Sequence, residues 1–199
     1  MIGLLVTALV AVAGCSSPAP THPKPANHDR PRPNFVFVLT DDLSWNLVSH
    51  MPNLQALQQA GTTMSRYYVV DSLCCPSRSA IFTGQYPHDD GVFTNAGNDG
   101  GYFAFNQHGD EQKSFALALH DAGYRTAMMG KYLNQYQPAY PEPPGWDEWD
   151  AAGNAYGEFD YNLNQNGLQQ HYGKDPQDYL TDVLAAKASS FIDSSAASG

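Results

Sequence analysis

Apolar residues along this chain gather in short blocks that are separated by prolines, glycines and polar turns. Three blocks favour strands: an unbroken apolar run at 35–39, an alternating run at 63–70 and a third run at 124–129. An unbroken run is typical of a strand buried on both faces, and alternation is typical of a strand with one buried face. The pattern therefore predicts three strands.

Helical spacing of apolar residues occurs between these runs and after them. It predicts helices over residues 52–60, 76–83, 113–122 and 179–192. A glycine just beyond each of the first three is a typical helix end. Residues 159–172 are predicted to form a hairpin that turns at Asn166-Gly167, and residues 138–144 form a proline-rich loop. Because strands and helices alternate, we predict an α/β fold with a largely parallel sheet flanked by helices.

The composition narrows the possible partners of this fold. The chain has 199 residues, 42% of them hydrophobic, which suits one ordinary domain or part of a larger one. Asp and Glu number 20 against 10 Lys and Arg, and the net charge is −10. Such a surface repels nucleic acid and anionic lipid, so neither is expected as a partner of the folded part. A site for an anionic substrate must build its positive charge locally.

The N-terminal residues indicate export. Residues 1–14 are apolar but shorter than the roughly 20 residues that span a bilayer. Small residues followed by Cys15 resemble a bacterial lipoprotein signal (1–15), in which Cys15 is lipidated, although no Lys or Arg precedes the run. An ordinary secretory peptide or an uncleaved anchor is the alternative. Residues 16–33 are a proline-rich tether, and the domain is expected at 34–199, outside the cytoplasm as a membrane lipoprotein or a secreted protein.

Two neighbouring thiols, Cys74 and Cys75, lie at the N-terminus of the second predicted helix, just before its first residue. Adjacent cysteines cannot easily bridge each other, so two thiols stay unpaired in an exported chain. A helix N-terminus favours negative charge, which activates a thiol or binds an anion, and Arg78 in the first turn adds a donor for an oxyanion. The alternative is two small buried apolar side chains and a surface arginine.

Two further features lie at predicted strand ends, where ligands collect in parallel α/β sheets. Asp41 and Asp42 follow the first predicted strand. Two adjacent carboxylates suit a hard divalent cation, and the alternative is that one of them caps the following turn or helix. Lys131 follows the third predicted strand, where it supplies a mobile positive charge for a ligand or, as the alternative, is an ordinary surface lysine. Together with the cysteines and Arg78, these residues indicate a hydrolase of anionic esters.

Residues 73–84 resemble the signature of the type I sulfatases, Cys-x-Pro-Ser-Arg followed by Thr-Gly. The resemblance implies the alkaline phosphatase/sulfatase-like fold and a Cα-formylglycine made from Cys74 by a formylglycine-generating enzyme. It also implies that Asp41, Asp42 and the modified Cys74 bind Ca²⁺, and that Arg78 and Lys131 hold the nucleophile and the sulfate. His88 is a lesser candidate for the mouth of the site, with an exposed loop histidine as its alternative.

The resemblance has one departure and points to a subfamily. Many sulfatases carry a histidine two residues after the lysine, where this chain has Leu133. The chain resembles the N-acetylglucosamine-6-sulfatases in this variant, in the double cysteine and in the segments 86–88 and 179–184. The implied substrates are sulfate esters of amino sugars or aryl sulfates.

The implied mechanism uses hydrated formylglycine, whose one hydroxyl attacks sulfur and displaces the alcohol. The other hydroxyl then drives elimination of sulfate and restores the aldehyde. Family members are much longer and supply further metal ligands, a second lysine and a leaving-group histidine. We therefore expect this chain to be the N-terminal portion of a sulfatase that holds about half of the active site.

Three alternatives stay open. The first is a phosphonate or phosphodiester hydrolase of the same superfamily. The second is an inactive, truncated surface lipoprotein in which the motif is a relic. The third is metal or redox binding by Cys74 and Cys75, which is disfavoured because two adjacent thiolates do not make a tetrahedral zinc site.

Overall fold

A computed structural model describes residues 32–198 of the chain. The chain divides into two units, Met1–Thr40 and Asp41–Gly199. The predicted lipidation site, Cys15, lies outside the described residues, as do the rest of the signal segment and most of the tether. Across residues 32–198, every helix is too short or too polar to cross a lipid bilayer.

The predicted strand at 35–39 is not formed. Phe35 to Leu39 carry no helix or strand assignment, and their relative exposure runs from 44% to 79%. A strand exists through hydrogen bonds to a neighbouring strand, and none of the sheet pairings within residues 32–198 includes this run. The prediction from local hydrophobicity was therefore wrong for the described chain.

The second unit begins with the 3₁₀ helix η1 (Trp45–His50) and the helix α1 (Pro52–Ala60). The sequence predicted α1 with these bounds. Pro52 stands in its first turn, where a missing backbone N–H costs nothing. The predicted strand at 63–70 is not formed, and its side chains are exposed, with Tyr68 at 84%. Alternation alone does not make a strand without a neighbour to pair with.

Five short helices come next along the chain. They are α2 (Cys74–Thr83), α3 (Pro87–Asp90), α4 (Gly101–Gln107), η2 (Asp110–Lys113) and α5 (Phe115–Asp121). α2 begins two residues before the predicted start and ends at Thr83. Gly84 follows it with a φ of +69°, a conformation that glycine adopts without strain. The helix predicted over 113–122 is interrupted by Ser114, whose hydroxyl accepts a hydrogen bond from the Ala116 N–H at 3.2 Å and caps α5.

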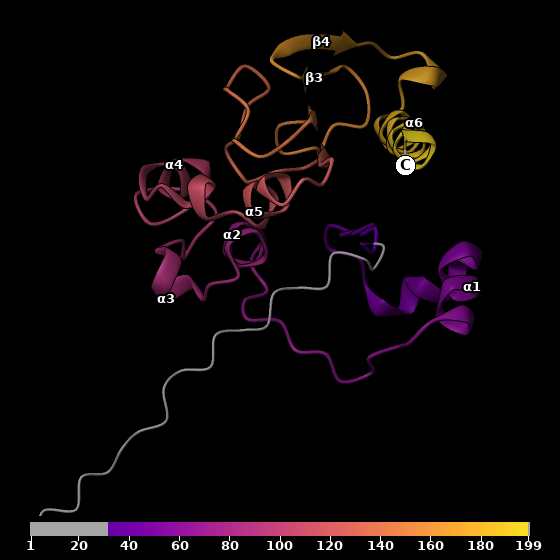
Figure 1. Cartoon of the computed structure of the whole chain (residues 1–199), viewed down its shortest axis with the longest axis horizontal. Helices are drawn as coiled ribbons and strands as arrows, with labels where there is room; N and C mark the ends of the chain where they lie inside the picture. The colour runs from indigo at the N-terminus through magenta and orange to yellow at the C-terminus, as the bar shows by residue number, and fades with distance from the viewer. Residues whose placement is uncertain (1–31, 199) are drawn as a thin grey trace, which may run out of the picture. The chain divides into compact units, whose positions relative to one another are not determined.

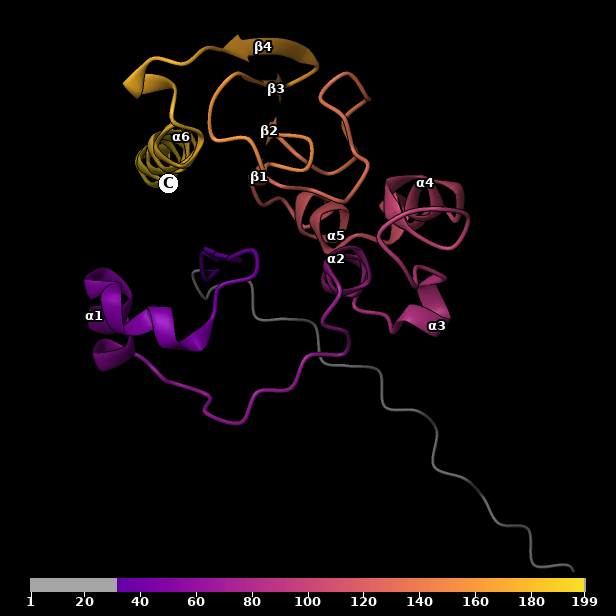
Figure 2. The same ribbon diagram turned by 180° about the vertical axis from the view of Figure 1, so that it is seen from behind.

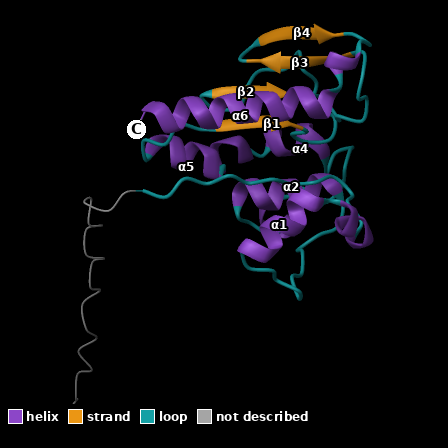
Figure 3. Cartoon of the chain, turned by 90° about the vertical axis from the view of Figure 1, so that its right-hand side faces the viewer, coloured by secondary structure: helices purple, strands orange, loops and turns teal. Residues whose placement is uncertain are grey.

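Within residues 32–198 the strands form one four-stranded sheet in the order β1-β2-β3-β4. Their bounds are β1 Ala127–Gly130, β2 Glu148–Ala151, β3 Tyr161–Gln165 and β4 Leu168–Tyr172. β1 and β2 pair in parallel and the other pairs are antiparallel, so the fold is α/β as predicted but this sheet is mixed. β3 and β4 lie side by side (Figure 3) and turn at Asn166-Gly167, both at positive φ, as the sequence predicted.

Apolar side chains cover the sheet in two clusters. The larger cluster packs α2 and α4 against β1 and β2, and includes Cys75, Phe82, Phe105, Tyr132 and Trp149. The smaller cluster packs Leu163 of β3 against the long helix α6 (Leu180–Ser198), which follows the 3₁₀ helix η3 (Pro176–Asp178). Figures 1 and 2 show α6 on one side of the strands and α4 on the other. The larger cluster thus fixes the start of α2 near the end of β1.

Candidate active site

Three charged residues that are distant in the sequence meet at the start of the second unit. Arg78, in α2, is 7% exposed and donates from Nη1 to the Lys131 carbonyl at 2.6 Å and from Nη2 to Asp41 Oδ1 at 3.2 Å. Lys131 follows β1 directly, and its Nζ donates to both Asp41 carboxylate oxygens at 3.0 and 2.9 Å. The structure therefore brings Asp41, Arg78 and Lys131 into one cluster, which we call the charge cluster.

The charge cluster is stable in its ionised form. Partial burial disfavours the charged carboxylate of Asp41, but Lys131 and Arg78 outweigh it and hold the pKa of Asp41 below its usual value. Burial likewise disfavours the Lys131 ammonium, but the hydrogen bond to Tyr156 and the charge of Asp41 raise the pKa of Lys131. Two cations and one anion leave a net charge of about +1 in a chain whose net charge is −10.

The two neighbouring thiols have different surroundings. Both are free, but Cys74 is partly exposed while Cys75 is fully buried. The Cys75 N–H donates to Asn95 Oδ1 at 2.7 Å, and burial raises the pKa of the Cys75 thiol to about 11. Cys74 begins α2 one helical turn before Arg78, so the two side chains are neighbours on the helix surface. Cys74 is therefore the accessible thiol, and it lies by the charge cluster.

The described residues do not by themselves form a calcium site. Ca²⁺ takes six to eight oxygen ligands, and residues 32–198 contain no group of three or more His, Cys, Asp or Glu placed to hold a metal ion. Both oxygens of Asp41 face Lys131, and the adjacent Asp42 is exposed with a φ of +52°. The donor chemistry of Asp41 and Asp42 suits calcium, but it provides only two of the required ligands.

The contacts of His88 within the described residues are with its sequence neighbours. It stands in the short helix α3 with its side chain 71% exposed. Its ring stacks on Tyr86 at a centroid distance of 5.6 Å, and its Nε2 is 3.4 Å from Asp89 Oδ2. Within residues 32–198 it thus interacts with Tyr86 and Asp89, and its role at the mouth of the site stays a prediction.

The sequence did not reveal Tyr156, which contacts Lys131 in two ways. Its hydroxyl oxygen accepts a hydrogen bond from Lys131 Nζ at 3.0 Å, and Nζ lies 4.6 Å from the centroid of its ring. Tyr156 belongs to the loop between β2 and β3 and to no motif. The only signal was an aromatic residue between two glycines, Gly153 and Gly157, which is too common to predict a site.

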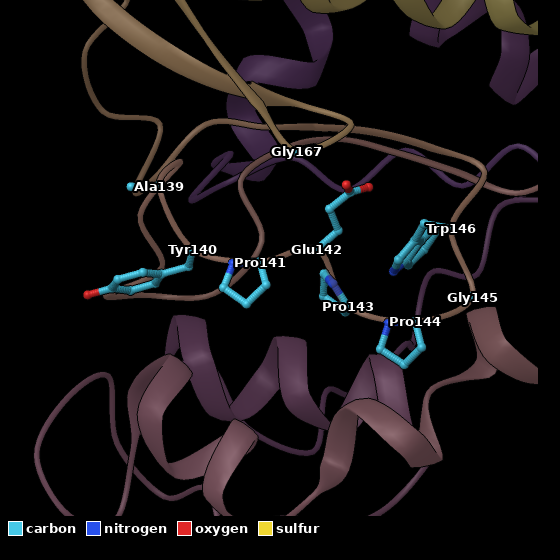
Figure 4. A pocket seen from close by; sticks show the side chains of 9 residues that line it. All are labelled: Ala139, Tyr140, Pro141, Glu142, Pro143, Pro144, Gly145, Trp146 and Gly167. Carbon is cyan, nitrogen blue, oxygen red and sulfur yellow. The ribbon is translucent and has the colours of Figure 1, made fainter.

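The structure also has an open pocket of about 630 Å³. It is lined by the predicted proline-rich loop, by Trp146 and by the hairpin turn at Gly167 (Figure 4). The Glu142 carboxylate points toward that turn (Figure 4). None of Asp41, Arg78 and Lys131 lines this pocket, so it is separate from the charge cluster.

The model of the Sulfatase family matches residues 33–198. The chain belongs to the sulfatase family. Over 168 residues it is 39% identical to an extracellular sulfatase SULF-1 homolog of Drosophila melanogaster, a match that covers 82% of this chain. It is 36% identical to human N-acetylglucosamine-6-sulfatase over 174 residues, and this match covers 81% of this chain.

A solved structure also resembles this sulfatase chain. BT4656 in complex with its substrate D-glucosamine-2-N,6-O-disulfate superimposes with a TM-score of 0.56 over 71% of this chain, at 28% identity. The likeness confirms the sulfatase-like α/β fold. The chain spans 15% of the length of the Drosophila relative, 31% of the human one and 26% of BT4656.

Proposed function

We propose that this chain carries the nucleophile and two sulfate-binding cations of an enzyme that hydrolyses sulfate esters. The observation that carries the proposal is that Arg78, one helical turn after Cys74 at the start of α2, donates a 2.6 Å hydrogen bond to the carbonyl of Lys131. A sulfate ester is an anion, and a strongly acidic chain attracts it only where cations are concentrated. Both cations have buried side chains, at 9% and 4% exposure, where charge is less screened than at the surface.

We propose Cys74 as the residue that is converted to formylglycine by a formylglycine-generating enzyme. Its position in the sulfatase signature and its partial exposure support the choice over the fully buried Cys75. Formylglycine supplies a hydrated aldehyde that can attack sulfur and later release sulfate. Arg78, which is fixed by the Lys131 carbonyl, would orient that group, and Lys131 would balance the charge of the sulfate.

Calcium is the metal that we propose for the site, with Asp41 and Asp42 as two of its ligands. Carboxylate oxygens are the donors that calcium prefers, and the two residues are adjacent. Binding would require Asp41 to turn its oxygens from Lys131 toward the metal. The remaining ligands, including the modified Cys74, would complete the coordination.

Sulfated amino sugars are the proposed substrate class, with aryl sulfates as the second choice. The support comes from the name of the human relative and from the glucosamine disulfate bound to BT4656. We also propose that the protein is located outside the cytoplasm, because the Drosophila relative is an extracellular sulfatase. We propose residues 1–15 as a signal with lipidation at Cys15, residues 16–33 as the tether and residues 34–199 as the sulfatase domain. We also propose that the protein contacts the membrane only through the lipid and that it has no nucleic acid partner.

The test uses the protein expressed from its complete reading frame together with a formylglycine-generating enzyme. We expect it to hydrolyse N-acetylglucosamine-6-sulfate or p-nitrophenyl sulfate faster than the matching phosphodiester. Mass spectrometry of the peptide with Cys74 should show the aldehyde. Cys74→Ala should abolish activity, and the matched control Cys75→Ala should keep it. Faster turnover of the phosphodiester, or an unmodified Cys74 in an active enzyme, would contradict the proposal.

A further inference from the structure

Lys131 is held at both of its ends. Arg78 fixes its backbone through the 2.6 Å hydrogen bond to its carbonyl. At the other end the ammonium group has three N–H donors, and the structure offers three acceptors: the two oxygens of Asp41 and the hydroxyl of Tyr156. A lysine stem of four carbons is flexible, so these contacts decide where its charge lies.

The two side-chain partners differ in charge. Asp41 is an anion and cancels the charge of Lys131, whereas the phenol of Tyr156 is neutral and holds the ammonium without cancelling it. Under the proposed function Asp41 would be a ligand of the metal ion, and the Lys131 ammonium would be needed to balance the charge of the sulfate. Tyr156 is then the partner within the described residues that keeps the ammonium in place.

The loop that carries Tyr156 is anchored on both sides of it. On one side, Asn154 Oδ1 accepts a hydrogen bond from the Gln135 N–H at 3.2 Å. On the other side, the Glu158 carbonyl accepts from the Leu180 N–H at 2.9 Å. Between them Ala155 has a φ of +53°, a conformation that residues other than glycine rarely adopt. The loop therefore places Tyr156 over Lys131 at a cost in backbone strain.

We propose that Tyr156 is a positioning residue of the sulfatase site. Its hydroxyl and ring hold the Lys131 ammonium beside Asp41 and Arg78, and they leave the positive charge of Lys131 available to the sulfate. The proposal rests on the proposed function. Tyr156 itself is 63% exposed, so its replacement removes little from the core.

Steady-state kinetics of the formylglycine-loaded protein test the proposal. Tyr156→Phe removes the hydroxyl and keeps the ring, and we expect kcat on a sulfate ester to fall about five-fold with KM nearly unchanged. Tyr156→Leu removes both contacts, and we expect a fall of about 10- to 30-fold. The matched control is Tyr68→Phe, because Tyr68 is 84% exposed and lies in the unpaired run at 63–70; it should leave kcat unchanged. An unchanged kcat in both Tyr156 variants of an active enzyme overturns the proposal.

A second readout separates this proposal from the proposed function. Acetylation of Lys131 by an amine-reactive ester, followed by peptide mass spectrometry, should be faster in Tyr156→Phe and fastest in Tyr156→Leu. Lys174, which is exposed, serves as the internal reference within each sample. If the wild-type protein hydrolyses no sulfate ester, the proposed function fails, and the labelling alone then decides whether Tyr156 holds Lys131. Equal labelling rates in all three proteins would refute it.

Discussion

Residues 63–70 and residues 124–129 are both predicted as strands, but only the second run contributes to one, β1 at 127–130. The difference lies in their neighbours. β1 pairs in parallel with β2 and contributes Met128 to the larger apolar cluster, whereas the side chains of 63–70 are exposed. The comparison teaches that strand formation here depends on pairing and burial. Local pattern alone does not decide it.

The largest effect is expected where the paired region is most buried. Trp149 of β2 is 0% exposed and packs edge-to-face against Tyr132 at 5.0 Å. Trp149→Ala should lower the free energy of unfolding by about 3–5 kcal/mol. Tyr68→Ala, in the unpaired run, should change it by less than about 0.5 kcal/mol. Urea denaturation compares the two, and similar losses would show that residues 63–70 are as well packed as β2.

The next largest effect is expected at Lys131, the positive charge that directly follows β1. Under the proposed function, Lys131→Ala should lower kcat on a sulfate ester by a factor on the order of 10² to 10³, because a buried charge that would balance the sulfate is lost. Lys174→Ala is the matched control, since Lys174 is exposed and its ion pair within residues 32–198 is with the exposed Asp160. Activity close to wild type in Lys131→Ala would remove Lys131 from the site.

A smaller effect is expected at the turn that sets the β3–β4 pairing. Gly167 has a φ of +83°, which costs a residue with a side chain about 1–2 kcal/mol. Gly167→Ala should therefore lower the free energy of unfolding by about that amount. In Gly157→Ala the added carbon would meet the Phe159 carbonyl oxygen at an ordinary 3.6 Å, so it should cost less. Thermal unfolding ranks the two, and the reverse order would contradict the turn geometry.

The smallest effect is a dependence on pH at the start of β1. Burial opposes the charge of Asp147, but hydrogen bonds from Thr126 and the nearby His120 outweigh it and lower the pKa of Asp147. A carboxyl group with a lowered pKa stabilises the fold above its unfolded pKa of about 3.9, and this contribution is lost as the pH falls through the folded value. Asp147→Asn should therefore destabilise by on the order of 0.5 kcal/mol at pH 7.

Denaturation of Asp147→Asn and wild type at several pH values checks this sign. The difference between the two should shrink as the pH drops below about 4. A difference that stays constant from pH 7 to pH 3 would show that the hydrogen bond matters and the charge does not.

Local signals predicted the elements that local interactions stabilise. α1 and α2 follow from their proline and glycine boundaries, and the hairpin follows from Asn166-Gly167. β2 was missed because Glu148–Ala151 mixes charged and apolar residues, and it forms a strand because β1 and β3 pair with it. The predicted strand at 35–39 failed for the converse reason, since its strong local pattern has no pairing partner within the described residues.

The sequence by itself determined the family signature at the start of α2 and the residue types of the charge cluster. It could do so because the signature is contiguous and because glycines and prolines act through local backbone geometry. Only the tertiary structure decided which charges meet: it paired Asp41 with Lys131 across 90 positions and placed the ring of Tyr156 against the ammonium. Contacts between distant residues depend on packing and pairing of whole elements, and no local pattern encodes them.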